Sequence, residues 1–109
     1  MEQWLATMRA AWINADLEAI KVLFAKTTEY YETPFYKPAI NTSEILELWI
    51  GVNKQIIKRL DFTILAIDGD TAIIHWIFEH EGASFDGIYQ IKFNDNNDCI
   101  FFKAWEMEK

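Results

Sequence analysis

The sequence predicts an α+β fold in which a curved, mainly antiparallel sheet is wrapped by about three N-terminal helices. Apolar residues recur at helical spacing in three segments of the first half of the chain. In the second half they alternate with polar residues, most clearly from Phe85 to Phe93. Turn residues separate this segment from its strand-like neighbours. Hairpin-linked strands that follow helices can form a curved sheet that encloses a pocket.

The helices are placed by their apolar faces and their caps. The first is expected over residues 2–13. Asp16 is the expected N-cap of the second, which ends near Lys26, and Thr42 or Ser43 is the expected cap of the third. The residues that recur at helical spacing are Trp4, Leu5, Met8, Ala11 and Trp12, then Leu17, Ile20, Leu23 and Phe24, and then Ile45, Leu48, Trp49 and Val52.

The strands follow from alternation and turn chemistry. The segment from Tyr30 to Pro34 is expected to be extended, because the residue before Pro34 is pushed out of helical geometry. A loop over residues 35–42 contains Pro38. Four strands are expected at residues 56–67, 71–80, 84–94 and 99–107. Their turns lie at Asp68-Gly69, at Gly82 and in the run Asn94-Asp95-Asn96-Asn97-Asp98.

Side chains on a strand point alternately to opposite faces, so each strand has a predicted inner set. The inner sets are Ile74, Trp76 and Phe78, then Phe85, Tyr89, Ile91 and Phe93, and then Ile100, Phe102, Ala104 and Glu106. A β-bulge would reverse the assignment beyond it. The outer face mixes apolar residues (Ile73, Ile77, Ile88, Phe101 and Trp105) with His75, Gln90, Lys92 and Lys103. Such a surface predicts a homodimer joined through the outer face of the sheet.

Composition restricts the classes of function. A length of 109 residues allows one core, and five tryptophans, four tyrosines and eight phenylalanines can fill it or line a pocket. A net charge of −7 argues against nucleic-acid and anionic-membrane partners. Cys99 has no cysteine to pair with. The N-terminal residues have no signal-peptide pattern, and no apolar stretch approaches the roughly 20 residues of a membrane span. A cytoplasmic location is expected.

The order of these elements, with several landmarks, resembles the nuclear transport factor 2-like superfamily, and within it the small SnoaL-like proteins. The landmarks are Asp16-Leu17-Glu18-Ala19-Ile20, Tyr31-Glu32-Thr33-Pro34, the loop before a Trp-bearing third helix, Asp86-Gly87 and Phe102-Lys103-Ala104-Trp105. The resemblance covers nearly the whole chain and implies a single SnoaL-like domain over residues 1–109. It also implies a cone-like, cystatin-like α+β fold with a cavity, usually in a dimer. The superfamily includes isomerases, dehydratases, cyclases, epoxide hydrolases and non-catalytic binding modules, so the fold alone gives no function.

The catalytic residues of the ketosteroid isomerases cannot be carried over to this chain. Their general-base aspartate stands immediately before the proline, where this chain has Thr33. Their oxyanion-hole aspartate corresponds to Tyr89, and the tyrosine of their first helix falls near Met8. Threonine cannot abstract a carbon-bound proton at neutral pH.

Glu32 and Glu106 are instead the predicted catalytic residues. Glu32 lies one residue from the position of the isomerases' base, and a partly desolvated carboxylate there would have a raised pKa. The alternative is a solvated glutamate at the rim. Glu106 is inward by alternation and would be the second carboxylate. The predicted ligand-binding residues are Tyr30, Trp49, Trp76, Tyr89 and Phe102, with the tyrosines donating to a ligand oxygen. Alternatively, the tyrosines only satisfy a local backbone acceptor, and the tryptophans only fill the core.

No metal site or cofactor is expected. His75, Glu79 and His80 suggest metal ligands, but on a strand positions 75 and 80 face opposite sides. His75 is expected on the outer face and His80 in a solvated turn. The sequence also lacks a Gly-rich phosphate loop and a nucleophile elbow.

Two functions remain open. The first is a pocket protein that binds a small, apolar, oxygen-bearing ligand and that could catalyse its isomerisation, dehydration, cyclisation or hydration. The second is a non-catalytic dimeric interaction or ligand-binding module. A cavity of a few hundred Å³ with Glu32 at its wall would favour the first. A cavity plugged by Trp76, Phe85 and Phe102 would favour the second.

Overall fold

The computed structural model describes residues 1–32, 37–50 and 56–108 of the chain. Three helices and five strands occupy these residues. The helices are α1 (Glu2–Ile13), α2 (Leu17–Leu23) and α3 (Thr42–Trp49), and the strands are β1 (Glu29–Tyr31), β2 (Ile57–Asp68), β3 (Thr71–His80), β4 (Ala83–Phe93) and β5 (Cys99–Glu108). Thr33, Pro34 and Val52, on which parts of the sequence predictions fall, lie outside the described residues.

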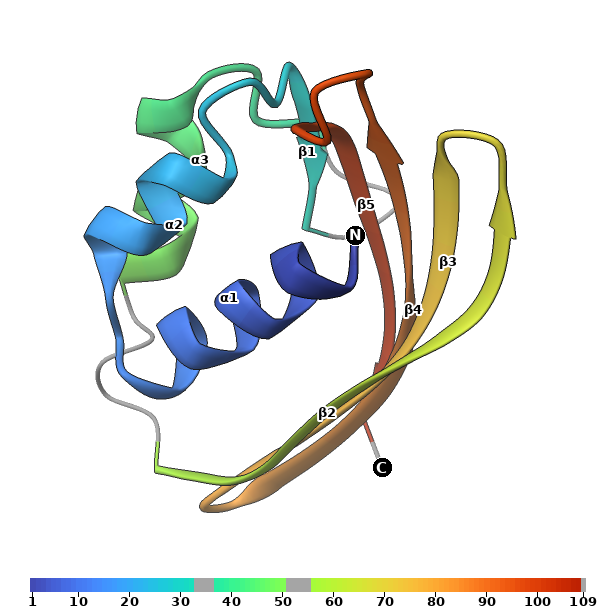
Figure 1. Cartoon of the computed structure of the whole chain (residues 1–109). Helices are drawn as coiled ribbons and strands as arrows, with labels where there is room; N and C mark the ends of the chain where they lie inside the picture. The colour runs from blue at the N-terminus through green and yellow to red at the C-terminus, as the bar shows by residue number, and fades with distance from the viewer. Residues whose placement is uncertain (33–36, 51–55, 109) are drawn as a thin grey trace.

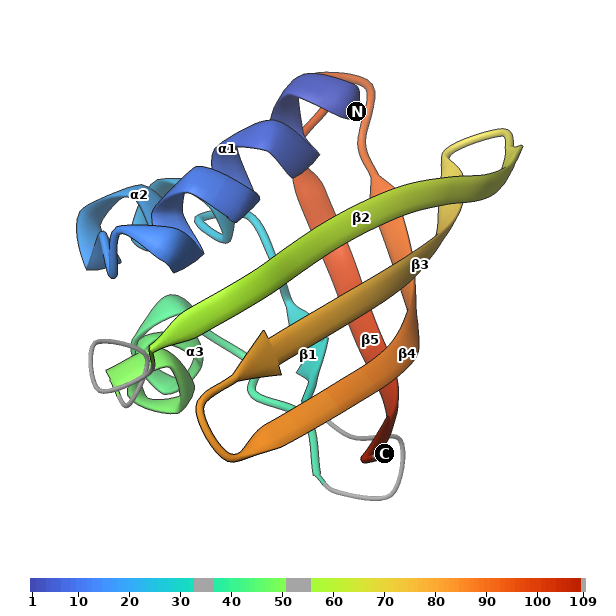
Figure 2. The ribbon, with the colours of Figure 1, turned by 90° about the horizontal axis from the view of Figure 1, so that it is seen from below.

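The strands form one curved sheet in the order β1-β5-β4-β3-β2. The pairs β2–β3, β3–β4 and β4–β5 are antiparallel, whereas β1 pairs with β5 in parallel. The three helices lie on the concave side, and β2 and β3 curl beneath α1 (Figures 1 and 2). The predicted α+β fold with a curved, mainly antiparallel sheet is confirmed.

The hairpin turns fall where the sequence places them. Gly69 joins β2 to β3 with a φ of +61°, and Gly82 joins β3 to β4 with a φ of +95°. Both values lie in the left-handed region, where glycine avoids the clash of a Cβ atom. In the turn between β4 and β5, Asn97 has a φ of +63°, and asparagine is one of the few other residues that tolerate this region.

The helix caps agree with the sequence in one case and differ in the other. Asp16 caps α2, because its side chain accepts a hydrogen bond from the Ala19 backbone N–H. The cap of α3 is Asn41 rather than Thr42 or Ser43, and its side chain accepts from the Glu44 N–H. Asparagine and serine are nearly equivalent caps, so composition could not decide between neighbouring positions. Helix α2 also ends at Leu23, earlier than predicted.

The predicted inner face of the sheet forms the core together with the helices. The buried residues on the inner face of β3, β4 and β5 are Ala72, Ile74, Trp76 and Phe78 of β3, Tyr89, Ile91 and Phe93 of β4, and Phe102 and Ala104 of β5. One bulge changes the assignment at the start of β5: Lys92 pairs with Phe101 but Phe93 pairs with Cys99. Cys99 is therefore buried, while Ile100 is only half-buried.

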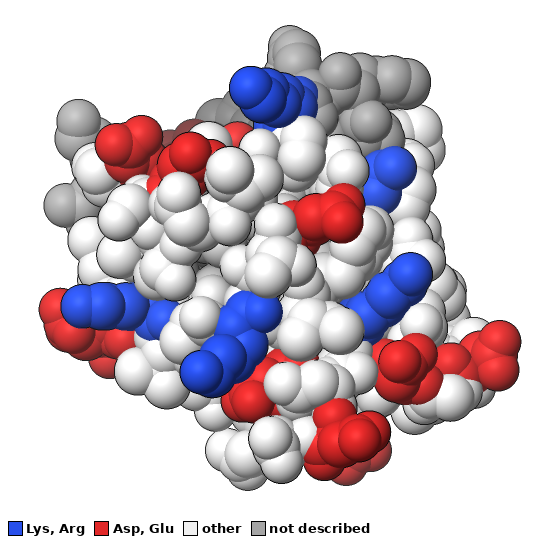
Figure 3. All heavy atoms as spheres, turned by 90° about the horizontal axis from the view of Figure 1, so that it is seen from above, with Lys and Arg blue, Asp and Glu red and all other residues white. Residues whose placement is uncertain are grey.

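The outer face is half-buried along β3, β4 and most of β5, and it carries the predicted mixture of apolar and polar residues. Trp105 and Met107, near the end of β5, are exposed. On the face of the molecule in Figure 3, acidic and basic side chains are interspersed, so the net negative charge is not gathered there in one patch. Among the described residues, no helix is long and apolar enough to cross a membrane.

Candidate functional site

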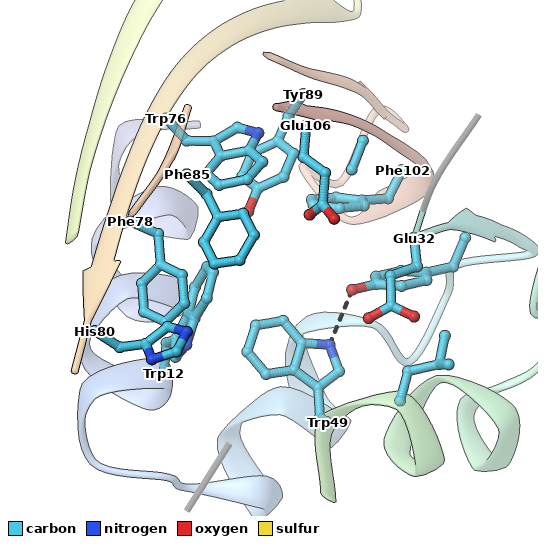
Figure 4. Close-up of a pocket in the computed structure, with 13 residues that line it drawn as sticks. Trp12, Glu32, Trp49, Trp76, Phe78, His80, Phe85, Tyr89, Phe102 and Glu106 are labelled. Carbon is cyan, nitrogen blue, oxygen red and sulfur yellow. Dashed lines mark hydrogen bonds between the residues drawn. The ribbon is translucent and has the colours of Figure 1, made fainter. Parts of the chain in front are cut away.

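A cavity of about 290 Å³ lies between the concave face of the sheet and helices α1 and α3 (Figure 4). Its wall combines aromatic rings with a few polar groups. The residues that line it are Trp12, Tyr30, Glu32, Leu48, Trp49, Trp76, Phe78, His80, Phe85, Tyr89, Phe102, Ala104 and Glu106. All seven residues that the sequence nominated for catalysis or ligand binding belong to this set.

Two buried tyrosines mark the deep part of the cavity. The Tyr30 ring stacks on Phe102 with ring centroids 4.9 Å apart, and its hydroxyl oxygen accepts a hydrogen bond of 3.1 Å from Trp49 Nε1. Tyr89 comes from β4 and packs against the other side of this group, 4.6 Å from Phe102 between ring centroids. The two tyrosines thus come from β1 and β4, the strands on either side of β5, and both line the cavity.

Both tyrosine hydroxyls are protonated donors. Burial raises the pKa of Tyr30 above its ordinary value, and the nearby negative charge of Glu32 raises it further. Burial likewise raises the pKa of Tyr89, with smaller contributions from Tyr30, Glu106 and Glu32. The Tyr89 hydroxyl forms no hydrogen bond to any residue in the described part of the chain, and its side chain is only 4% exposed. A ligand with an acceptor oxygen would satisfy this donor.

Trp76 forms the wall beside Tyr89. The two rings stack with centroids 5.2 Å apart and planes inclined by 17°. Trp76 pairs in register with Gly87 of β4, where a Cβ atom would lie 2.5 Å from its Cζ2 atom. Glycine at position 87 therefore lets the indole lie flat against the sheet, which leaves space for the cavity. The buried Trp76 Nε1 has no hydrogen-bond partner among the described residues.

The two carboxylates meet at the cavity rim. Glu32 directly follows β1, and the parallel pairing of Tyr31 with Lys103 brings it beside the inner row of β5, which contains Glu106. Figure 4 shows both carboxylates directed toward the cavity. Although Glu32 is exposed at the rim, partial burial of its carboxyl group raises its pKa, and the negative charge of Glu106 raises it further. The predicted direction of the Glu32 shift is confirmed.

The two histidines occupy opposite faces, as alternation predicts. His75 lies on the outer face, with its Nε2 atom 2.5 Å from Oδ1 of Asp86. The prediction that His80 is a solvated turn residue is wrong, because His80 ends β3 on the inner side and lines the cavity. Its ring stacks near Phe85, with centroids 5.9 Å apart. Within the described ranges, no three His, Cys, Asp or Glu side chains are grouped so that they could hold a metal ion.

Sequence reasoning also missed Trp12, Phe78 and Phe85 as cavity residues, although it placed all three on inward faces. Their alternation and helical spacing separate inner from outer positions, but they do not separate the cavity wall from the solid core. For His80 a signal was present. Continuing the inner row 74, 76, 78 by one step reaches position 80.

Solved structures with the same arrangement of elements include three informative cases. A steroid delta-isomerase from Pseudomonas aeruginosa has a TM-score of 0.73 and 16% identity, covering 97% of this chain and 78% of that one. A nuclear transport factor 2-like protein of unknown function from Burkholderia xenovorans has a TM-score of 0.74 and 9% identity, covering 96% and 80%. A putative SnoaL-like polyketide cyclase from Shewanella denitrificans has a TM-score of 0.71 and 13% identity, covering 97% and 89%.

The chain has the nuclear transport factor 2-like fold. The predicted resemblance is confirmed at the level of the fold, which is what identities below 20% establish. No protein-family model matches the sequence, and no curated protein matches it significantly. The polar groups of the cavity are two carboxylates at the rim, two tyrosine hydroxyls at depth and His80 at its wall.

Proposed function

We propose that this chain binds a small, apolar, oxygen-bearing molecule in the cavity and catalyses a proton transfer on it. The observation that carries the proposal is a carboxylate with a raised pKa, Glu32, on the wall of a largely aromatic cavity that also contains two protonated tyrosine hydroxyls. Isomerisation, dehydration and cyclisation all need a base of this kind. The steroid isomerase and polyketide cyclase among the structural neighbours support the same class.

In the proposed reaction, Glu32 takes a proton from the carbon next to a ligand carbonyl group. The electron pair of the broken C–H bond moves toward the carbonyl oxygen, where negative charge develops. The Tyr89 hydroxyl donates a hydrogen bond to this oxygen and so stabilises the charge. Glu32 then returns the proton to another carbon, which completes an isomerisation. A raised pKa makes Glu32 a stronger base than an ordinary carboxylate.

The remaining cavity residues have supporting roles. Glu106 is the second carboxylate, and its charge keeps the pKa of Glu32 raised. Trp49 holds the Tyr30 hydroxyl oxygen through the hydrogen bond described above, so that the Tyr30 proton can point toward a ligand. Trp76 and Phe102 supply flat apolar walls for a ring system.

Solvent exchange tests this proposal without knowledge of the natural substrate. The protein is incubated in D₂O with a panel of cyclic ketones and enones, and deuterium entry next to the carbonyl is followed by NMR. We expect catalysed exchange with at least one ligand, and loss of a hundredfold or more in the Glu32→Gln variant, the range in which general bases contribute. Exchange should fall as the pH is lowered through the raised pKa of Glu32, because protonation removes the base.

Glu29→Gln is the matched control, because Glu29 lies on β1, which Glu32 directly follows, and its carboxylate accepts a hydrogen bond of 3.0 Å from the Tyr31 hydroxyl. It should exchange at the wild-type rate. Full exchange by the Glu32→Gln variant would remove Glu32 from the mechanism. Absence of exchange across the panel, despite ligand binding, would instead favour a non-catalytic pocket.

The second candidate is a non-catalytic module that dimerises through the outer face of the sheet. It is favoured by the half-buried apolar residues on that face, such as Ile77 and Ile88, and by exposed Trp105. The homodimer is compatible with either function, because the outer face and the cavity lie on opposite sides of the sheet. We also propose that the protein is located in the cytoplasm.

A further inference from the structure

We propose that the ligand of this cavity is an organic cation: a protonated or quaternary amine on a single-ring body, with its charge at Glu32 and Glu106 and an acceptor oxygen at Tyr89. This inference names the substrate class for the function proposed above and shares its cavity, but it does not require that the chain catalyse a reaction.

The charge of the cavity is the first support. Glu32 and Glu106 carry formal negative charge, and none of the described lining residues is Lys or Arg. The nearby Lys103 is turned to the outer face, where its ammonium group lies 4.9 Å from the centre of the Tyr31 ring. The formal charge of the described residues at the rim is therefore negative. It attracts cations and repels carboxylates and phosphates.

The electrostatic state of Glu32 is the second support. The negative charge of Glu106 acts on Glu32 across the rim, which makes it unfavourable for both groups to be ionised together. An ammonium group between the two carboxylates would remove this repulsion and gain two favourable charge interactions. A neutral ligand would leave the repulsion in place.

The aromatic walls are the third support. Trp12 and Trp49 meet nearly at right angles, with ring centroids 5.2 Å apart and planes inclined by 83°. Phe78 lies beside Trp12, with ring centroids 4.7 Å apart, and Phe85 stacks near Phe78 at 6.0 Å; Figure 4 shows Trp49 on the opposite side of the cavity from these two phenylalanines. Aromatic faces attract cations through their ring quadrupoles, and enclosures of this kind favour alkylated ammonium groups.

The Tyr89 hydroxyl is an independent indication of a ligand, because Tyr89 lines the cavity and its hydroxyl has no acceptor in the described part of the chain. It lies at depth, whereas the carboxylates are exposed at the rim. The ligand therefore needs a cationic end and an acceptor end. A volume of about 290 Å³ suits such a molecule. At roughly 20–30 Å³ per non-hydrogen atom, judged from the share of a water molecule in the liquid, about 10–14 atoms fill it.

A pair of isosteric probes tests the charge requirement. 4-Acetyl-N,N,N-trimethylanilinium and 4-tert-butylacetophenone have the same shape and the same ketone, but only the first is charged. Binding to the full chain is measured by tryptophan fluorescence and isothermal titration calorimetry, with 4-acetylbenzoate as an anionic comparison. We expect the cation to bind at least tenfold more tightly than the neutral ketone, and the anion not to bind.

The variants locate the binding. Glu32→Gln and Glu106→Gln should each weaken binding of the cation threefold to tenfold more than binding of the neutral ketone, while Glu29→Gln should alter the affinity for neither probe. Tyr89→Phe should weaken the acetyl-bearing cation but not phenyltrimethylammonium, which lacks the acceptor. The glutamate variants test whether the rim carboxylates bind the charge of the probe. The Tyr89→Phe variant tests whether the Tyr89 hydroxyl binds its acetyl oxygen.

The outcomes separate this inference from the proposed function. Equal affinity for both probes, or tighter binding of the neutral ketone, would overturn the cation assignment and leave the proton-transfer proposal standing. Equal losses in the Glu29→Gln and Glu32→Gln variants would show non-specific attraction and would also overturn it. If neither probe nor any ketone of the panel binds, both proposals fail.

Discussion

The inner and outer faces of the sheet differ in which neighbours their polar groups have. On the outer face polar groups are matched by neighbours: His75 contacts Asp86, and the ammonium groups of Lys92 and Lys103 lie over the rings of Phe101 and Trp105. On the inner face like charges share one rim, and the Tyr89 hydroxyl lacks an acceptor among the described residues.

This difference shows which part of the molecule lowers the stability of the folded state. A surface whose polar groups interact with one another needs no polar ligand, although its apolar residues can still bind an apolar partner. A cavity wall that leaves the buried Trp76 Nε1 donor without a partner among the described residues, and that holds two carboxylates near one another at its rim, lowers the stability of the fold there. Perturbed groups of this kind concentrate at functional sites, which is why the cavity rather than the outer face carries our main proposal.

The largest expected effect is a difference in stability between two substitutions at neighbouring positions of β5, one on each face of the sheet. Phe102 is 1% exposed and contacts the rings of Tyr30 and Tyr89, so Phe102→Ala should reduce the free energy of unfolding by about 3–5 kcal/mol. Phe101→Ala, on the half-buried outer face, should cost roughly 1 kcal/mol. Urea denaturation measures both. Equal losses would mean that the two faces contribute equally to the core.

Gly87→Ala should test how the inner face keeps its cavity open. The added Cβ would lie 2.5 Å from Trp76 Cζ2 and 2.1 Å from the Trp105 backbone oxygen, so the strands or the indole must move. We expect a loss of about 1–3 kcal/mol and weaker binding of the ketone probes. Gly82→Ala meets nothing within 4 Å and should leave probe binding intact. Unchanged binding by Gly87→Ala would show that Trp76 does not define the cavity.

Trp105→Glu should test the outer face as a dimer interface. A charge in a desolvated apolar contact is unfavourable, so the dimer should weaken at least tenfold, or about 1.4 kcal/mol. Analytical ultracentrifugation measures the dissociation constant. Val22→Glu, at a 75% exposed position on α2, is the control. A Trp105→Glu protein that dimerises like the wild type would refute this interface.

The smallest effects should have opposite signs on the two faces. Because folding raises the pKa of Glu32, stability falls as the pH rises from the ordinary value of 4.5 through the raised value. Glu32→Gln should therefore stabilise the protein at pH 7, by roughly 0.2–0.5 kcal/mol after solvent screening, and should have no such effect well below pH 4.5. Asp86→Asn should instead destabilise it by roughly 0.2–1 kcal/mol. Thermal unfolding curves at both pH values would expose a wrong sign.

Much of the sheet could be predicted because strand alternation is a local property. Trp76, Tyr89 and Phe102 were placed on one face from spacing alone, and Gly69 and Gly82 marked their turns. The bulge at Ile100 could not be placed, because it depends on how β5 meets its neighbour rather than on its own sequence.

It was harder to predict which side chains meet in the cavity than to predict which face of the sheet carries it. Glu32 and Glu106 were nominated separately, but their interaction depends on the parallel pairing of β1 with β5, which no local pattern encodes. His80 was missed because flanking Glu79 and Glu81 suggested a solvated turn. The contacts with Phe78 and Phe85 decide its position instead, and these are tertiary.

The pairing of β1 with β5 also has a kinetic consequence. It joins segments about 72 residues apart, as the hydrogen bond from Thr27 to the Cys99 carbonyl illustrates. Closing so large a loop costs conformational entropy before the β1–β5 contacts form. The three hairpins from β2 to β5 need only short loops, so their strands can pair locally. We expect the hairpins to assemble early and β1 to dock late. The two glutamates would then come together in the final folding step, after most of the barrier has been crossed.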